Sequence, residues 1–184
     1  MDDQLGSRIA GGNTAYERNK SDFYPTPPDV TKALLRFLQL PKSIEIWEPA
    51  CGEGHMVTAI REEGYECLGT DIEDGQDYLT FDTPVGIDYI ITNPPFSLAT
   101  QFIEKSIERG LPFAFLLKCQ FFHAKSRYAL FESYPPTWVL PLTWRPDFLF
   151  KTRGKGSPLM DVMWVVWQPG DHRATYQPLA RPMI

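Results

Sequence analysis

The chain of 184 residues is 43% hydrophobic and 14% aromatic, which fits one folded domain and excludes a disordered chain. No apolar run approaches the roughly 20 residues of a membrane-spanning helix. The opening segment MDDQLGSRIAGG contains no secretory signal. Cys51, Cys67 and Cys119 lie far apart, without the spacing of a metal site or the even number of a disulfide framework. We therefore expect a cytoplasmic protein that has no membrane contact and no metal.

The net charge of −5 argues against attraction of nucleic acid to the whole surface, but the charge is unevenly distributed. Residues 40–110 carry fourteen acidic and four basic side chains, whereas residues 118–155 carry seven basic and two acidic ones. The second segment could therefore contact phosphate with one face of the protein. An ordinary solvated surface is the alternative interpretation.

The two ends of the chain differ from the part between them. Residues 1–21 are polar and without periodicity, which predicts a flexible arm. A helix is predicted next, with Thr26 as its N-cap and with Pro27 and Pro28 in its first positions. Residues 169–184 are rich in proline and predict an irregular tail.

Between these ends, strand patterns and helix patterns alternate along the chain. Such alternation predicts a single α/β domain, here over residues 22–168, with a mainly parallel sheet. The predicted strands cover 44–48, 65–71, 77–81 (the weakest pattern), 87–92, 112–118, 137–142 and 160–167, and the further helices cover 56–63, 98–109 and 123–133.

Ligands of open α/β sheets bind beyond the carboxyl ends of the strands, and several strands here end in polar residues. The first strand ends in Glu48, and the turn after it contains Gly52, which lets the backbone pass close to a ligand. The second ends in Asp71, whose carboxylate suits the two hydroxyls of a ribose. Asp77 could accept a hydrogen bond from an adenine amino group, with Asp82 as the alternative.

The glycine turn, PACGEG, does not favour a dinucleotide. It lacks the third glycine of the dinucleotide fingerprint, and Glu53 within it would repel a pyrophosphate. Glu48 would also repel a pyrophosphate but suits an ammonium group. An adenosine with a cationic amino-acid tail fits this pattern better.

The fourth strand ends in the segment ITNPPFS, residues 91–97. Because proline has a fixed φ and no N–H, two prolines in succession end the strand and make a rigid turn. Such a turn would hold Asn93 and Phe96 in fixed directions. A plain strand terminator is the alternative.

The segments DFYPTP, EPACGEG, GTDI, GQDYL and TNPPF together resemble the motif series of S-adenosylmethionine-dependent methyltransferases. The resemblance is to the enzymes that methylate N6 of adenine in DNA, in the motif order of their gamma group, and it covers residues 22–118. It implies a Rossmann-like class I methyltransferase fold, with a seven-stranded, mainly parallel sheet, an antiparallel last strand and helices on both faces. Small proteins of this kind are common in phages and prophages, so we expect a bacterial or phage-infected cell.

The resemblance implies a role for each residue that matches a motif. S-adenosylmethionine would be the cofactor, with Tyr24 and Thr26 at its methionine end, Asp71 at its ribose and Asp77 at its adenine. The full expected sets are, for the cofactor, Tyr24, Thr26, Glu48, Ala50, Gly52, Asp71, Ile72, Asp77 and Asn93, and, for catalysis, Asn93, Pro94, Pro95 and Phe96.

The implied chemistry explains the turn at the end of the fourth strand. An adenine amino nitrogen is a poor nucleophile because its lone pair is delocalised into the ring. Acceptors on Asn93 and on the carbonyl of Pro94 would each take one N6 hydrogen and free the lone pair, while Phe96 stacks on the base. Catalysis would then rest on positioning and preorganised acceptors. In a duplex the base must first be flipped out, at a cost of roughly a few kcal/mol.

The basic segment 143–157 could serve the DNA. Its Trp144, Phe148 or Phe150 could stack on a base, although a simple solvated connection is the alternative. Gamma-group enzymes usually carry a separate target-recognition domain; we expect none here, and therefore relaxed or short-site specificity. The expected nucleic-acid-binding residues are Lys125, Arg127, Arg145, Lys151, Arg153 and Lys155.

Other functions stay open at this point. The Asn-Pro-Pro-aromatic element also occurs in enzymes that methylate RNA bases and in those that methylate glutamine side chains. A binding module that keeps the cofactor or nucleic-acid site without turnover is the alternative from another class. The sequence does not predict the recognised bases or the oligomeric state.

Overall fold

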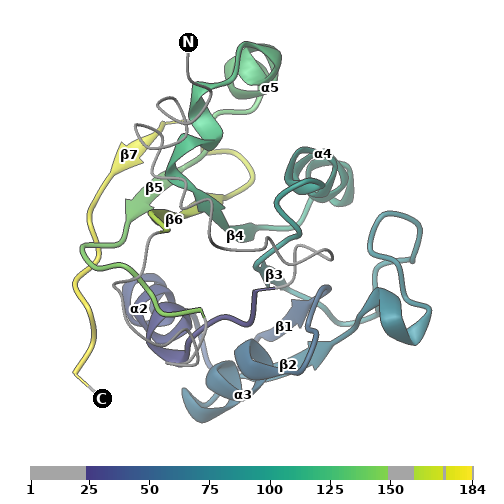
Figure 1. Ribbon diagram of the computed structural model, residues 1–184. Helices are drawn as coiled ribbons and strands as arrows, with labels where there is room; N and C mark the ends of the chain where they lie inside the picture. Colours follow the sequence, from purple (N-terminus) through teal and green to yellow (C-terminus); the bar gives the residue numbers. More distant parts are fainter. Residues whose placement is uncertain (1–23, 149–159, 172, 184) are drawn as a thin grey trace, which may run out of the picture.

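The structure, a computed structural model, describes residues 24–148, 160–171 and 173–183, and these form a seven-stranded mixed sheet with helices on both faces (Figure 1). The order of its strands is β2-β1-β3-β4-β6-β5-β7. Their bounds are β1 (Glu45–Glu48), β2 (Glu66–Gly69), β3 (Tyr89–Thr92), β4 (Phe113–Lys118), β5 (Trp138–Pro141), β6 (Val162–Trp167) and β7 (Thr175–Tyr176).

The sheet has a parallel half and a mixed half. Strands β2, β1, β3 and β4 run parallel, and β6 runs antiparallel to both of its neighbours, β4 and β5. From β1 the chain crosses to β2 on one side, and then back to β3 on the other side of β1. The carboxyl ends of β1 and β3 therefore flank the point where the strand order reverses, which is where ligands bind in sheets of this type.

Two separate apolar layers cover the faces of the sheet. Helices α2 (Pro28–Leu38) and α3 (His55–Glu62) pack on one face, against side chains such as Ile46. Helix α4 (Ala99–Arg109) packs on the opposite face, against Trp47. Consecutive residues of β1 thus point to opposite layers, as the two-residue period of a strand requires.

The start of α2 differs from the sequence prediction. Pro27, not Thr26, occupies the N-cap position, and no side chain caps the helix. The predicted N-cap role of Thr26 is therefore wrong, and its hydroxyl makes a different contact, described below.

The third predicted strand, over 77–81, is also wrong. The amides of Thr80 and Phe81 bond to the carbonyl of Asp77, and the Leu79 amide bonds to the Asp77 carboxylate at 3.0 Å. These local bonds make a turn, because an Asp side chain that accepts from the backbone two residues on favours a turn over a strand.

Two further elements differ from expectation near the end of the chain. The helix predicted over 123–133 is shorter: 3₁₀ turns cover Cys119–His123 and Lys125–Arg127, and α5 covers Tyr128–Ser133. The predicted irregular tail contains the short strand β7, which pairs in parallel with β5. Among the described residues no helix is long and apolar enough to cross a membrane.

Candidate active site

A pocket of about 420 Å³ lies at the carboxyl ends of β1, β2 and β3. Residues from four separate stretches of the sequence line it, because the parallel strands bring their carboxyl ends to one edge of the sheet. All nine of the expected cofactor-binding residues are on its wall, namely Tyr24, Thr26, Glu48, Ala50, Gly52, Asp71, Ile72, Asp77 and Asn93.

The glycine turn after β1 is held in place by the loop after β2. Gly52 and Gly54 have φ values of 48° and 78°, a left-handed backbone that residues with a Cβ rarely adopt. The backbone N–H of Gly52 donates to Oδ2 of Asp71 at 2.8 Å, and Oδ1 of Asp71 accepts from the Glu73 N–H at 3.0 Å. Asp71 thus organises two walls of the pocket, and each oxygen keeps a second lone pair for a ligand hydroxyl.

Glu48 is the buried acid of the pocket, with 2% of its surface exposed. Its Oε1 accepts a hydrogen bond of 2.6 Å from the hydroxyl of Thr92. Burial raises the pKa of Glu48 to about 7, the charge of Asp71 adds to the rise, and hydrogen bonds from Thr92 and the Ala50 backbone oppose it. A cationic ligand group beside this carboxyl would favour its ionised form.

The pocket is strongly acidic. Because like charges repel, an anionic phosphate is disfavoured there and a cation is favoured. The described residues contain no cluster of His, Cys, Asp or Glu side chains that could hold a metal ion. The acidic lining residues are Glu48, Glu53, Asp71, Glu73, Asp74 and Asp77.

In the side-chain amide of Asn93, the nitrogen has hydrogen-bond partners among the described residues and the oxygen has none. Its Nδ2 donates to the backbone carbonyl of Tyr24 at 2.9 Å and to the hydroxyl of Thr26 at 3.1 Å, so both amide hydrogens have acceptors. Its Oδ1 is buried but has no hydrogen-bond partner among the described residues. A buried carbonyl oxygen without a donor is unfavourable, and a ligand that supplies an N–H would relieve the cost.

In the rest of the Asn-Pro-Pro-Phe turn, Pro95 belongs to the pocket lining, whereas Pro94 and Phe96 do not. Pro94 is buried, Pro95 lines the pocket, and the carbonyl of Pro95 accepts from the Leu98 N–H at 2.9 Å, just before α4 begins. The ring of Phe96 lies 5.6 Å from that of Tyr24, and Nζ of Lys118 lies 4.1 Å from its centre. A cation over an aromatic face is attracted to the ring and would also attract phosphate.

The expected nucleic-acid-binding residues fall into three groups. Arg127 donates to the carbonyl of Phe121 at 2.6 Å and lies over the Phe121 ring, so its guanidinium supports the local fold. Arg145 makes a two-point ion pair with Asp161, which raises the pKa of Arg145. Lys125 is exposed. Lys151, Arg153 and Lys155 lie outside the described residues, as does Phe150.

Two of the aromatic side chains expected to stack on a base, those of Trp144 and Phe148, make contacts within the fold. The indole N–H of Trp144 donates to Oδ2 of Asp29 in α2 at 3.1 Å. Phe148 is 3% exposed and packs edge-on against Tyr24, with ring centres 6.3 Å apart. The burial of Phe148 argues against a free stacking face on its ring, and the bond to Asp29 fixes the half-buried indole of Trp144 against α2.

Sequence reasoning missed several residues of the site. Tyr78 and Phe102 line the pocket, Thr92 donates to Glu48, and Lys118 lies over Phe96. Lys118 ends a parallel strand, so the rule that placed the other site residues could have found it. The contacts of Tyr78 and Phe102 depend on tertiary packing, which leaves no local pattern.

Comparison with known proteins gives one sequence relative and several structures. No protein-family model matches the chain. The chain is 27% identical over 88 residues to a type II methyltransferase of Thermus thermophilus. The matched part is 40% of this chain and 21% of that enzyme, so the chain spans only a small part of this relative.

The solved structures share the fold at low sequence identity. The methyltransferase subunit of a type I restriction-modification system from Streptococcus thermophilus has a TM-score of 0.64 and 14% identity, over 95% of this chain and 50% of that one. A modification subunit attributed to a type I restriction enzyme of Vibrio vulnificus YJ016 has a TM-score of 0.56 and 12% identity, over 95% of this chain and 49% of that one. A Lactococcus lactis protein described as a hemolysin has a TM-score of 0.54 and 7% identity, over 82% of this chain and 91% of that one.

These likenesses, together with the strand order and the antiparallel β6, define the class of the fold. It is the Rossmann-like fold of methyltransferases, which confirms the predicted fold class. The part of the chain that matches a type II methyltransferase adds a sequence relationship to that enzyme class. Because one fold hosts many activities, the substrate has to be argued from the site.

Proposed function

We propose that this protein transfers a methyl group from S-adenosylmethionine to the N6 amino group of adenine in DNA. One observation carries the proposal: both amide hydrogens of Asn93 are taken by Tyr24 and Thr26, and its buried Oδ1 has no donor among the described residues. An exocyclic amino group is the donor that this oxygen lacks. From the order of its motifs we further propose that the protein is of the gamma type and acts in the cytoplasm of a bacterium or a phage-infected cell.

The chemistry of the pocket fits the cofactor. S-adenosylmethionine carries an ammonium and a sulfonium, and six acidic side chains line the pocket. Glu48 would face the ammonium, Asp71 the ribose hydroxyls and Asp77 the adenine amino group. Ile72, which is 64% exposed on the pocket rim, would cover the apolar face of the adenine.

The side chains of this protein would act by positioning the target base. Oδ1 of Asn93 and the carbonyl of Pro94 would each accept one N6 hydrogen, which draws the nitrogen lone pair out of the ring. Phe96, braced by the neighbouring Tyr24 ring, would hold the plane of the base. Bound S-adenosylmethionine would supply an electrophilic methyl group and leave as S-adenosylhomocysteine, while the attacking N6 nitrogen would release one proton to water. No covalent enzyme intermediate is required.

The proposal of DNA as the substrate rests on two supports. The sequence relative is a type II methyltransferase, and two of the structural neighbours are subunits of restriction-modification systems. Lys118 beside Phe96 gives the target side of the site a positive charge. We propose short-site or relaxed specificity.

The test uses purified protein, methyl-labelled S-adenosylmethionine and separate pools of duplex DNA, single-stranded DNA, structured RNA and protein. Product nucleosides are identified by mass spectrometry, with Asn93→Ala as the inactive control. N6-methyladenine in DNA that depends on Asn93 would establish the proposal. Label found only in RNA would replace DNA by RNA as the proposed substrate, and label found only on glutamine would replace it by protein. Tight cofactor binding with no label in any pool would leave a binding module.

A further inference from the structure

The long loop between β2 and β3 forms a wall of the pocket. It contributes Asp77 and Tyr78 to the lining, and Asp77 is the residue proposed at the adenine of the cofactor. The described part of this loop contains the 3₁₀ turn Ile72–Asp74 and the turn that starts at Asp77, but no strand. Local hydrogen bonds shape the turn at Asp77, and contacts from outside the loop join this turn to the rest of the domain.

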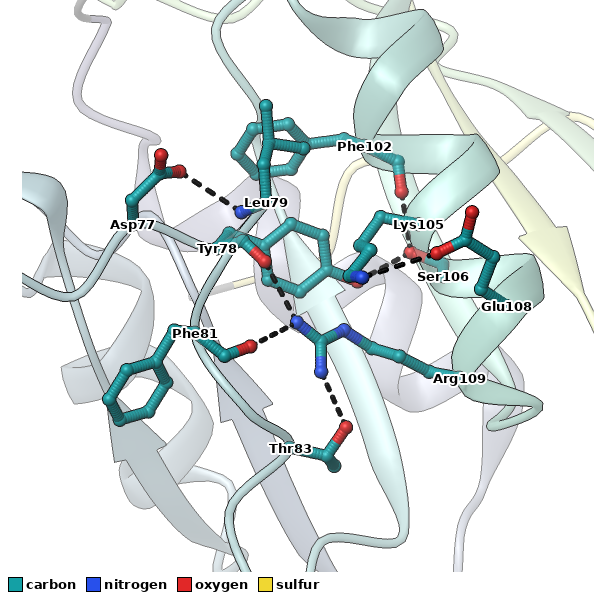
Figure 2. Close-up of polar contacts among 10 residues, drawn as sticks. All are labelled: Asp77, Tyr78, Leu79, Phe81, Thr83, Phe102, Lys105, Ser106, Glu108 and Arg109. Atoms are coloured by element: carbon teal, nitrogen blue, oxygen red, sulfur yellow. Dashed lines mark hydrogen bonds and ion pairs between the residues drawn. The ribbon is translucent and has the colours of Figure 1, made fainter.

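Most of these contacts come from Arg109, the last residue of α4 (Figure 2). Its Nη2 donates to the backbone carbonyls of Tyr78 at 2.8 Å and Phe81 at 2.6 Å, and its Nη1 donates to the Thr83 hydroxyl at 2.5 Å. Three acceptors in one loop thus converge on a single guanidinium. Hydrogen bonds from a charged donor are about twice as strong as neutral ones.

Aromatic rings hold the guanidinium in place. It lies 4.7 Å from the centre of the Tyr78 ring and 5.0 Å from that of Trp47 in β1. Its Nε is buried without a hydrogen-bond partner among the described residues, so every hydrogen bond from this guanidinium to the loop comes from an Nη atom. Lys in this place would keep a charge, but one ammonium cannot match the planar fork that reaches all three acceptors.

A second link joins the same loop to α4. The Tyr78 hydroxyl and the Ser106 hydroxyl are 2.6 Å apart, and Ser106 in turn donates to the carbonyl of Phe102 at 2.8 Å (Figure 2). The Tyr78 ring packs on Phe102, with centres 4.7 Å apart. Tyr78 is 1% exposed, so its side chain has little freedom.

We propose that Arg109 is a positioning residue for the adenosine end of the cofactor site. It lies outside the pocket lining and acts through Asp77 and Tyr78, which it holds against α4. The inference rests on the proposed function, because it assumes that the ligand of this pocket is an adenosine derivative. A purely structural Arg109 would stabilise the fold without affecting ligand affinity.

The test measures binding of two ligands by calorimetry. S-adenosylhomocysteine has both an adenosine and an amino-acid end, whereas methylthioadenosine has the adenosine end alone. Arg109→Lys should weaken both by the same factor, about tenfold, which is the scale of one charged hydrogen bond. Glu48→Gln should weaken only S-adenosylhomocysteine. Arg61→Lys is the matched control, because Arg61 is also near a helix end and donates to a strand carbonyl, that of Cys67 at 2.8 Å.

Hydrogen exchange gives a readout that does not depend on the ligand. In Arg109→Lys, the amides of Leu79, Thr80 and Phe81 should exchange faster, while those of β3 and β4 keep the wild-type rate. Ser106→Ala, which removes the partner of the Tyr78 hydroxyl and leaves Arg109 in place, is the second variant in case Arg109→Lys does not fold. It should weaken both ligands by about threefold.

The outcomes separate the two claims. If folded Arg109→Lys binds methylthioadenosine as tightly as the wild type does, the role of Arg109 is overturned and the proposed function is left intact. If only Ser106→Ala folds, the same result in that variant has the same meaning. A wild-type protein that binds neither ligand would overturn both. Equal weakening of the two ligands with faster exchange in the loop alone is the result that we expect.

Discussion

The hydroxyl of Thr92 donates a hydrogen bond of 2.6 Å to Oε1 of Glu48, and so joins the last residue of β3 to the last residue of β1. Both side chains are buried. Thr92 directly precedes Asn93. One hydrogen bond and one peptide bond therefore link the acid proposed for the cofactor, Glu48, to the amide proposed for the target base, Asn93. The Thr92–Glu48 bond thus connects the two parts of the proposed site directly.

Thr92→Val should weaken cofactor binding at neutral pH. Valine has nearly the same shape but no hydroxyl, so Glu48 loses a hydrogen bond that lowers its pKa, and its carboxyl becomes harder to ionise. The affinity for S-adenosylhomocysteine at pH 7 should fall by about tenfold and recover partly at about pH 8.5. Titration calorimetry across this pH range, with Thr92→Ser as the rescue, tests the effect. A pH-independent loss would contradict it.

Glu48→Gln should stabilise the free protein at high pH. The pKa of Glu48 is about 7 in the folded protein against an ordinary value of 4.5, so the folded state binds more protons between these values. Stability from this group is thus present below pH 4.5 and is lost as pH rises through 7, by about 3 kcal/mol. Neutral Gln removes that loss.

The measurement for Glu48→Gln is a pair of denaturant titrations at about pH 5 and about pH 8. The variant should gain a few kcal/mol over the wild type at the higher pH and much less at the lower one, while cofactor affinity falls at both. A variant that is less stable at the higher pH would show that Glu48 is held by contacts that Gln cannot keep.

Thr26→Val should slow methyl transfer with little change in cofactor affinity. The hydroxyl of Thr26 accepts from Nδ2 of Asn93, and without it the amide can rotate and turn Oδ1 away from the target. We expect kcat to fall by about tenfold or more, because a loss of alignment acts on the transition state. Thr26→Ser should restore the rate. A change in cofactor KM alone would instead place Thr26 at the methionine end of the cofactor.

The sequence is sufficient to predict the parts of the site that lie at strand ends. Asp71 and Asn93 each come at the end of a predicted strand, and the carboxyl ends of parallel strands meet at one edge, so their proximity could be predicted. Arg109 could not be predicted, because two of its partners are backbone carbonyls, which any residue supplies. The strand predicted over 77–81 is wrong for a related reason: the Asp77 carboxylate and Arg109 stabilise turns that its alternating pattern conceals.

Trp144 illustrates the limit of reasoning from composition. An aromatic residue in a basic segment suggests base stacking, but its indole N–H bonds to Asp29, which lies 115 residues earlier in the chain. Such a contact depends on the path of the whole chain and has no local pattern. The same holds for Arg181, which donates to the same Asp29 oxygen at 2.7 Å from the C-terminal tail.

Trp144→Phe should therefore destabilise the fold rather than weaken DNA binding. Asp29 is 3% exposed, and loss of the indole N–H leaves its buried carboxylate with one partner fewer, which costs about 1–3 kcal/mol. Urea titration should show this loss, with unchanged DNA affinity at fixed salt. Trp138→Phe is the control for lost ring area, because Trp138 packs edge-on against Phe37 at 5.2 Å. Wild-type stability with weaker DNA binding in Trp144→Phe would instead support a stacking role, since a residue that contacts only DNA contributes nothing to the free protein.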